Sequence, residues 1–127
     1  MHDRLAHQRA RAHHGRVVKC IGDGVLAVFP SAEDALAAAR LLAQDLALLS
    51  LRVRAAIHVG EVELRGEGDI GGLNVHVAAR LLATARTGEI VLSEAAAGAV
   101  AEDTTHVGDV ELRGLPGRWP VHTTSAA

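Results

Sequence analysis

Residues 16–29 read Arg-Val-Val-Lys-Cys-Ile-Gly-Asp-Gly-Val-Leu-Ala-Val-Phe, two short apolar runs separated by Gly-Asp-Gly. β-Branched and aliphatic side chains favour an extended backbone, whereas glycine and aspartate favour a tight turn. An Asp-Gly pair between two such runs is a strong local signal for a β-hairpin. The stretch therefore predicts two antiparallel strands, over residues 17–21 and 25–29, with Asp23 at the turn.

Helices are expected on both sides of this hairpin. Residues 2–14 are polar, rich in Arg and His and free of Gly and Pro, which predicts a helix that Gly15 ends. Ser31 is followed three residues later by Asp34, a pattern typical of a helix start. Leucines and alanines then recur at helical spacing, so a second helix is expected to run to Leu49.

The second half of the chain alternates strand and helix signals. The expected elements are, in order, strands over 51–59 and 61–65 that pair with each other, a glycine-rich loop over 66–72, a helix over 73–86, a strand over 89–92, a short helix capped by Ser93, and a last hairpin of strands over 107–112 and 121–123. Interleaved strands and helices indicate an α/β or α+β sandwich.

Composition limits the kind of protein. With 127 residues the chain is expected to form one domain, over residues 1–123, followed by a flexible tail over 124–127. A formal net charge of −2 gives no electrostatic case for binding nucleic acid or a membrane. The single cysteine, Cys20, excludes an internal disulfide framework, and no apolar run approaches the ~18 residues of a membrane span. These features favour a cytoplasmic protein.

Taken one at a time, the polar residues of this pattern have ordinary explanations. Asp23 offers a free carboxylate that suits a hard divalent cation, but a turn aspartate more often bonds its own backbone. Lys19 is equally an exposed strand lysine, and Asp69 is a loop aspartate or an acceptor for an exocyclic amine. His76 and Arg80 share one helix face, where the arginine suits a phosphoryl group or simply solvent.

The arrangement as a whole resembles the catalytic domain of class III nucleotide cyclases. Residues 15–29 resemble the hairpin that carries the second metal-binding aspartate of that family. Residues 54–61, Arg-Ala-Ala-Ile-His-Val-Gly-Glu, resemble its RxGIHxGE strand, and residues 69–81 resemble its DxxGxxVNxAARL block. Residues 88–93 and 110–116 resemble the two closing blocks. The blocks follow one another in family order and spacing over most of the chain.

The resemblance implies a role for each candidate residue. Asp23 is the second of two metal-binding aspartates, which hold Mg²⁺ or Mn²⁺. Lys19 donates to a ring nitrogen of adenine and Asp69 accepts from its amino group; guanine-specific members typically have Glu and Cys there, so this pair indicates ATP. Arg80 stabilises charge on the α-phosphate while the ribose 3′-hydroxyl attacks and pyrophosphate leaves. The family builds each site between two domains, one giving the aspartates and the other the base-reading residues and the arginine.

Two departures from the family pattern affect what we expect of this chain. The family's first metal aspartate lies on a strand before the hairpin, and neither is found in these 127 residues. We therefore expect a ferredoxin-like cyclase sandwich that lacks its first strand, an N-terminally truncated cyclase homology domain. The second departure is His76, which replaces the asparagine expected four residues before Arg80. This catalytic position then carries an imidazole in place of the carboxamide that orients the ribose.

Three interpretations follow. The first is an adenylate cyclase-like domain that makes little or no cyclic AMP as this chain alone. The second is a non-catalytic nucleotide-binding or dimerisation module, and the third is a complete enzyme whose natural chain starts upstream of Met1. The resemblance predicts a homodimer or a heterodimer with another cyclase domain, and an unpaired sheet edge favours strand exchange between chains.

Overall fold

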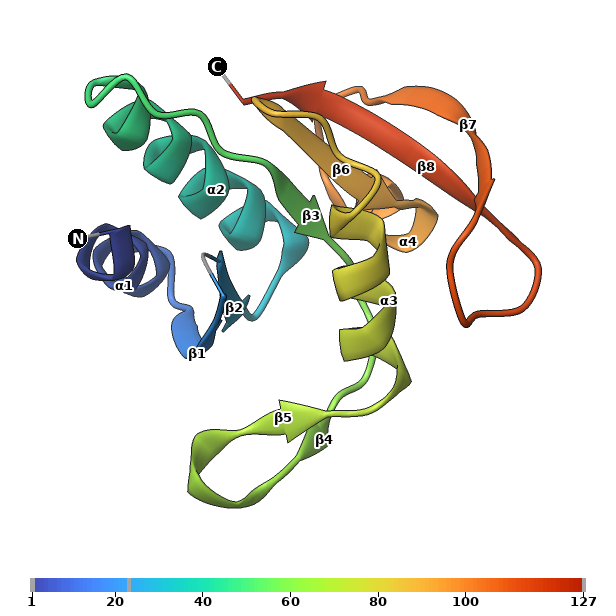
Figure 1. Ribbon diagram of the computed structural model, residues 1–127, viewed down its shortest axis with the longest axis horizontal. Coiled ribbons are helices and arrows are strands. Elements are labelled where there is room, and N and C mark those ends of the chain that lie inside the picture. The colour runs from blue at the N-terminus through green and yellow to red at the C-terminus, as the bar shows by residue number, and fades with distance from the viewer. Residues whose placement is uncertain (1, 23, 127) are drawn as a thin grey trace.

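The computed structural model describes residues 2–22 and 24–126, which form helices and short sheets (Figure 1). The elements are, in chain order, α1 (His2–Ala12), β1 (Arg16–Ile21), β2 (Gly24–Val28), α2 (Ala32–Ala47), β3 (Ala55–Ile57), β4 (Glu63–Leu64), a 3-10 turn (Gly66–Gly68), β5 (Ile70–Gly71), α3 (Leu73–Leu82), β6 (Glu89–Ser93), α4 (Glu94–Ala99), β7 (Thr105–Glu111) and β8 (Arg118–Ser125). The expected mixture of α and β elements is confirmed.

The main sheet has four strands in the order β3-β6-β8-β7, so β6 lies inside it. β3 runs parallel to β6, whereas β8 is antiparallel to both β6 and β7. The parallel pair needs a crossover, and α3 lies on the connection between β3 and β6. The predicted strand over 89–92 is thus the centre of the fold (Figure 1).

Alternating side chains of β6 enter two separate cores. Ile90 and Leu92 pack with residues of α2, β3 and α4 on one face of the sheet. Val91 packs on the other face with Val77 and Leu81 of α3 and with residues of the β7–β8 region. Because successive strand residues point to opposite faces, helices cover both faces of β6. These five side chains are at most 2% exposed, as expected of an aliphatic core.

The predicted hairpin forms as β1 and β2, but it makes a two-stranded sheet of its own. Among the described residues, no strand joins β2 to the four-stranded sheet. α1 lies against this hairpin and against α2, where Arg9 donates two hydrogen bonds to Asp45, at 2.6 and 2.8 Å. Two expectations stay predictions: that the fold lacks a first strand, and that the chain is truncated.

The prediction that the strand over 51–59 pairs with a strand over 61–65 is wrong. That strand is confined to β3, and β6 is its only described strand partner. Residues 63 and 64 pair instead with Ile70 and Gly71, which makes a small hairpin that projects from the body (Figure 1). After β3 the chain leaves the main sheet. Residues 63 and 64 therefore pair with β5, the strand that follows them in the sequence.

Two expected ends also differ from the structure. The helix expected over 73–86 ends at Leu82; beyond it, the backbone N–H groups of Thr84 and Ala85 donate to carbonyls three residues back, at 2.9 and 3.1 Å, which is a turn and not an α-helix. Thr124 and Ser125, expected in a flexible tail, belong to β8, and Ala126 packs against the core. One domain over residues 1–123 stays a prediction. Within the described part of the chain, no helix has both the length and the apolar character needed to cross a bilayer.

Candidate functional site

Lys19 and Asp69, both predicted to read a base, meet in the structure. The Nζ atom of Lys19 lies 3.0 Å from Oδ1 of Asp69. The same oxygen accepts a hydrogen bond from the backbone N–H of Ile70, at 2.8 Å. Oδ2 receives no donor from the residues that the structure describes. The pair therefore engages one carboxylate oxygen and leaves the other without a donor from the described residues.

The charge state of Asp69 follows from these contacts. The hydrogen bond from Lys19 lowers the pKa of the Asp69 carboxyl, and the Ile70 N–H and the nearby Arg65 guanidinium lower it further. Asp69 is therefore an ionised group that only accepts hydrogen bonds at neutral pH. Its side chain is 39% exposed and that of Lys19 is 45% exposed, so a ligand can reach both.

A bulge in β1 decides which way Lys19 faces. Val17 pairs with Ala27, but Lys19 pairs with Leu26, so Val18 is the extra residue. Residues opposite each other in an antiparallel pair share a face, and one extra residue reverses the alternation. The bulge therefore places Arg16 and Lys19 on the same face of the hairpin, although regular spacing would put them on opposite faces.

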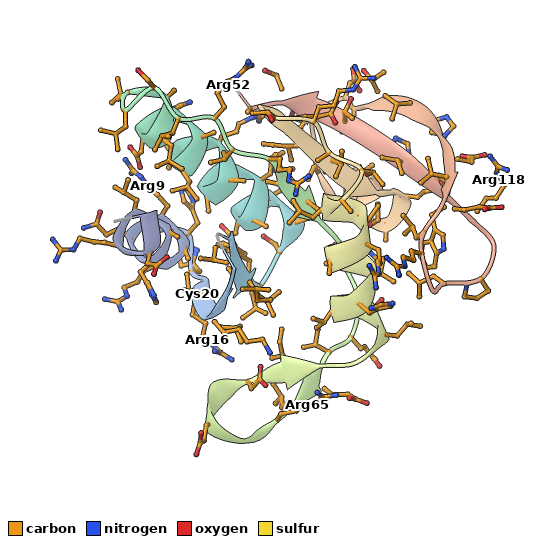
Figure 2. The ribbon with its side chains drawn as sticks, in the orientation of Figure 1. Arg9, Arg16, Cys20, Arg52, Arg65 and Arg118 are labelled. Atoms are coloured by element: carbon orange, nitrogen blue, oxygen red, sulfur yellow. The ribbon has the colours of Figure 1, made fainter. Side chains whose placement is uncertain are left out.

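Arg16 lies near this pair, and the sequence did not single it out as a candidate. A Cβ placed on Gly68, next to Asp69, would lie 3.6 Å from Nη1 of Arg16. Figure 2 shows Arg16 at the end of β1 that faces the β4–β5 hairpin, where Arg65 lies. The side chains of Arg16, Lys19 and Arg65 therefore bring three positive charges around the Asp69 segment, an environment that suits an electron-rich or anionic ligand.

His76 and Arg80 lie on α3, and no hydrogen bond or ion pair joins them to Lys19 or Asp69 in the structure. The Nε atom of Arg80 is buried and has no hydrogen-bond partner among the described residues. A buried donor without a partner costs free energy unless a ligand satisfies it. His76 faces the turn between β7 and β8, since a Cβ on Gly114 would lie 3.5 Å from its Nε2.

The predicted metal residue, Asp23, lies outside the described residues. Within residues 2–22 and 24–126, no three His, Cys, Asp or Glu side chains gather into a group that could hold a metal ion. A metal site made of three such side chains is thus absent from the described residues, and any site that uses Asp23 lies outside them. The predicted role of Asp23 stays a prediction.

Comparison with known proteins places this geometry in a family. No protein-family model matches the chain. A solved adenylate/guanylate cyclase/hydrolase from Silicibacter pomeroyi is 29% identical and has a TM-score of 0.76, over 91% of this chain and 75% of that one. In fold and in sequence, the chain is similar to class III nucleotide cyclase domains. The resemblance seen in the motifs is thereby confirmed.

Two further proteins bear on this cyclase domain. A solved adenylate cyclase from Trypanosoma brucei, described in its monomeric state, shares the fold with a TM-score of 0.83 at 20% identity, over 98% of this chain and 77% of that one. An uncharacterized protein of Mycobacterium tuberculosis is 39% identical over 101 residues, which are 75% of this chain and 35% of that protein. The chain thus spans about a third of that curated relative. Kinship to cyclases indicates a divalent-metal requirement in general.

Proposed function

We propose that this chain forms the base-reading half of an adenylate cyclase site that two cyclase domains build together. In this proposal Lys19 and Asp69 select adenine, and Arg80 stabilises negative charge on the α-phosphate. The observation that carries the proposal is the contact between Lys19 Nζ and Asp69 Oδ1, at 3.0 Å, beside an uncommitted Asp69 Oδ2.

The chemistry of the pair favours adenine over guanine. Adenine presents an amino group next to an unprotonated ring nitrogen, so Asp69 accepts from the first and Lys19 donates to the second. In the same pose guanine turns a carbonyl oxygen toward the carboxylate and an N–H toward the ammonium. Both contacts then become repulsive, and because both side chains are more than a third exposed, the two losses together weaken binding by about 1.5 kcal/mol, roughly tenfold.

Arg80 suits the transition state because its guanidinium is not already committed. Its buried Nε has no partner among the described residues, and a planar guanidinium matches the oxygens of a phosphoryl group. Charge that develops on the α-phosphate during attack by the ribose 3′-hydroxyl would be stabilised by such a donor. The departure at His76 affects the ribose and leaves this role of Arg80 intact.

In this proposal the other half of the site comes from a partner domain. The 127 residues contain one aspartate at a family metal position, Asp23, and the described residues gather no metal-binding group. We therefore propose that the chain alone makes little or no cyclic AMP. It is completed by a cyclase domain that supplies both metal-binding aspartates.

Nucleotide binding tests the base-reading role without requiring catalysis. Titration calorimetry with Mn²⁺ present is expected to show ATP binding about tenfold more tightly than GTP. Arg118→Ala is a matched control, because Arg118 lies on β8 at the far side of the molecule (Figure 2). It should leave both affinities unchanged. Equal binding of the two nucleotides, or no binding of either, would contradict the proposal.

A further inference from the structure

A chain of hydrogen bonds outside the proposed base site runs through His58, which directly follows β3. Its Nδ1 lies 2.7 Å from the hydroxyl of Ser93, at the end of β6. Its Nε2 lies 2.8 Å from Oδ1 of Asn74, in the first turn of α3. One imidazole thus connects the central strand of the sheet with the helix that carries Arg80.

The partners of this imidazole determine which nitrogen holds the proton. The Asn74 amide group donates to the Glu61 carbonyl at 2.8 Å, so its oxygen faces His58 as an acceptor. His58 Nε2 must therefore donate. The hydroxyl of Ser93 accepts from the Ala96 N–H at 3.2 Å and so keeps its own proton for Nδ1. Every polar atom is satisfied only by the neutral imidazole protonated at Nε2.

Backbone geometry around Asn74 is adapted to this contact. A Cβ on Gly60 would lie 2.4 Å from the side-chain Cγ and Nδ2 of Asn74, a distance that no side chain could accept. Glycine at this position lets the carboxamide lie against the turn after β3. The arrangement therefore depends on Gly60 as well as on the hydrogen-bonding side chains.

α3 has few other polar attachments to the fold. Its N-cap is Gly72, which provides no side-chain hydrogen bond. Among the described residues, Asn74 is the only residue of α3 whose side chain hydrogen-bonds to another element. The remaining contacts, through Val77 and Leu81, are apolar, and apolar packing is not directional. The bond from His58 to Asn74 is thus one of two side-chain hydrogen bonds that restrain the rotation of the helix, beside the bond from Asn74 to the Glu61 carbonyl.

The simplest alternative is that His58 is an interior histidine whose ring nitrogens are hydrogen-bonded and that has no further role. A nucleophilic role for its partner is excluded, because Ser93 is only 3% exposed and no substrate can reach it. The link to α3 distinguishes His58 from an ordinary packing residue. Rotation of α3 would displace the guanidinium of Arg80, which lies six residues after Asn74 on the same helix.

We propose that His58 is a positioning residue: its neutral imidazole holds Asn74, sets the rotation of α3 and so aims Arg80 at the phosphate. The last step rests on the proposed function, whereas the control of α3 by His58 does not. The structural part can therefore be measured without any cyclase activity.

Two substitutions separate positioning from general stability. His58→Gln places an amide N–H near the position of Nε2 and keeps the bond to Asn74. His58→Asn places its carboxamide near Nδ1, keeps the contact with Ser93 and loses Asn74. Both remove the same ring and leave one of the two bonds. Only a positioning role through Asn74 predicts that the two variants differ.

Hydrogen exchange and NMR test the structural part. In the unmodified chain, the imidazole nitrogen shifts of His58 should show the tautomer protonated at Nε2. Amides of α3 should exchange about fivefold or more faster in His58→Asn and in Asn74→Ala, and nearly normally in His58→Gln. The other tautomer, or equal exchange in the two His58 variants, would overturn the proposal. If either His58 variant fails to fold, the tautomer of His58 in the unmodified chain and the amide exchange of α3 in Asn74→Ala still test the proposal.

The catalytic part is measured in a mixture with a cyclase domain that retains both metal aspartates. His58→Asn should lower kcat about tenfold and leave KM for ATP within about twofold, because the base-reading pair is not on α3. His58→Gln should restore most of kcat. If the mixture is inactive even with the unmodified chain, the proposed function fails, while hydrogen exchange still decides the role of His58. If the mixture is active and kcat is equal for both His58 variants, the proposal that His58 positions Arg80 through Asn74 is contradicted.

Discussion

The Lys19 ammonium and the Asp69 carboxylate lie 3.0 Å apart, joining β1 to the loop that leads into β5. Each side chain is exposed by more than a third, so the pair contributes little to stability on its own. Folding does not require this pair, so its substitution is suited to testing the proposed base-reading role without unfolding the chain.

Substitution of this pair is expected to change the base preference. Lys19→Glu together with Asp69→Cys replaces a donor and an acceptor by the residues that guanine-specific cyclases typically have at these positions. The preference for ATP over GTP, about tenfold in the unmodified chain, should fall to about unity or reverse. Calorimetry with both nucleotides measures it. A variant that keeps the original preference would show that other residues select the base.

The network that fixes the C-terminal strand predicts a dependence of stability on pH. Arg40 of α2 donates to both carboxylate oxygens of Glu102, and the Thr124 hydroxyl of β8 donates to Oε2 at 2.6 Å. The hydrogen bonds from Arg40 and Thr124 lower the pKa of Glu102 from 4.5 to about 2. Stability from this group is therefore present above pH 4.5 and is lost as the pH falls toward 2.

Glu102→Gln removes that pH-dependent term. The free energy of unfolding at pH 7 should fall by about 1 kcal/mol, because part of the group is solvated and the full effect of the pKa shift is screened. Denaturant titrations at pH 7 and pH 3 should show a smaller acid loss in the variant. Glu111→Gln, on exposed β7, is the control and should behave like the unmodified chain. The same acid sensitivity in Glu102→Gln would contradict the assignment.

Local patterns in the sequence predict most elements but not how they pair. The hairpin sequence over 16–29 and the Ser31 cap act within a few residues, and their elements formed, whereas the alternation over 51–59 gave a strand only at residues 55–57. The pairing of β4 with β5 was not predicted, although the two are close in sequence, because residues 61–65 were paired with the preceding strand and the glycine-rich residues 66–72 were assigned to a loop. The bulge at Val18 was also missed, because the strand period of two assumes regular pairing.

The candidate functional residues divide in the same way. Lys19, Asp69 and Arg80 were found through family motifs, whereas Arg16 and His58 have no local signal. Arg16 enters the site through the bulge, and His58 acquires its role from partners on α3 and β6 that only the folded chain brings near. Interactions of this kind become visible only in three dimensions.

Gly60 provides a stability test of the contact with Asn74. Gly60→Ala adds a methyl group that would lie 2.4 Å from the Asn74 side chain, so the carboxamide must move and its hydrogen bonds break. The free energy of unfolding should fall by about 1–3 kcal/mol. Gly66→Ala is the matched control, because nothing lies within 4 Å of its added Cβ. The double variant Gly60→Ala, Asn74→Ala should be no less stable than Asn74→Ala; additive losses would contradict a shared contact.

The last prediction concerns catalysis by the composite site. The purified chain, even with Mn²⁺, is expected to make little or no cyclic AMP, since it carries one aspartate at a family metal position. Mixing it with a cyclase domain that retains both aspartates but lacks its own arginine or base-reading pair should produce activity. In that mixture Arg80→Ala should lower the rate by at least about a hundredfold, because transition-state charge loses its donor. Arg86→Ala, which changes an exposed arginine beyond α3, should have no effect.

Two further variants test the same mixture. Asp23→Ala should be tolerated because the partner supplies the aspartates, and His76→Asn should raise the rate by restoring the carboxamide that orients the ribose. Strong activity of the chain alone would refute the composite site, and failure to complement any aspartate-competent partner would refute the catalytic role.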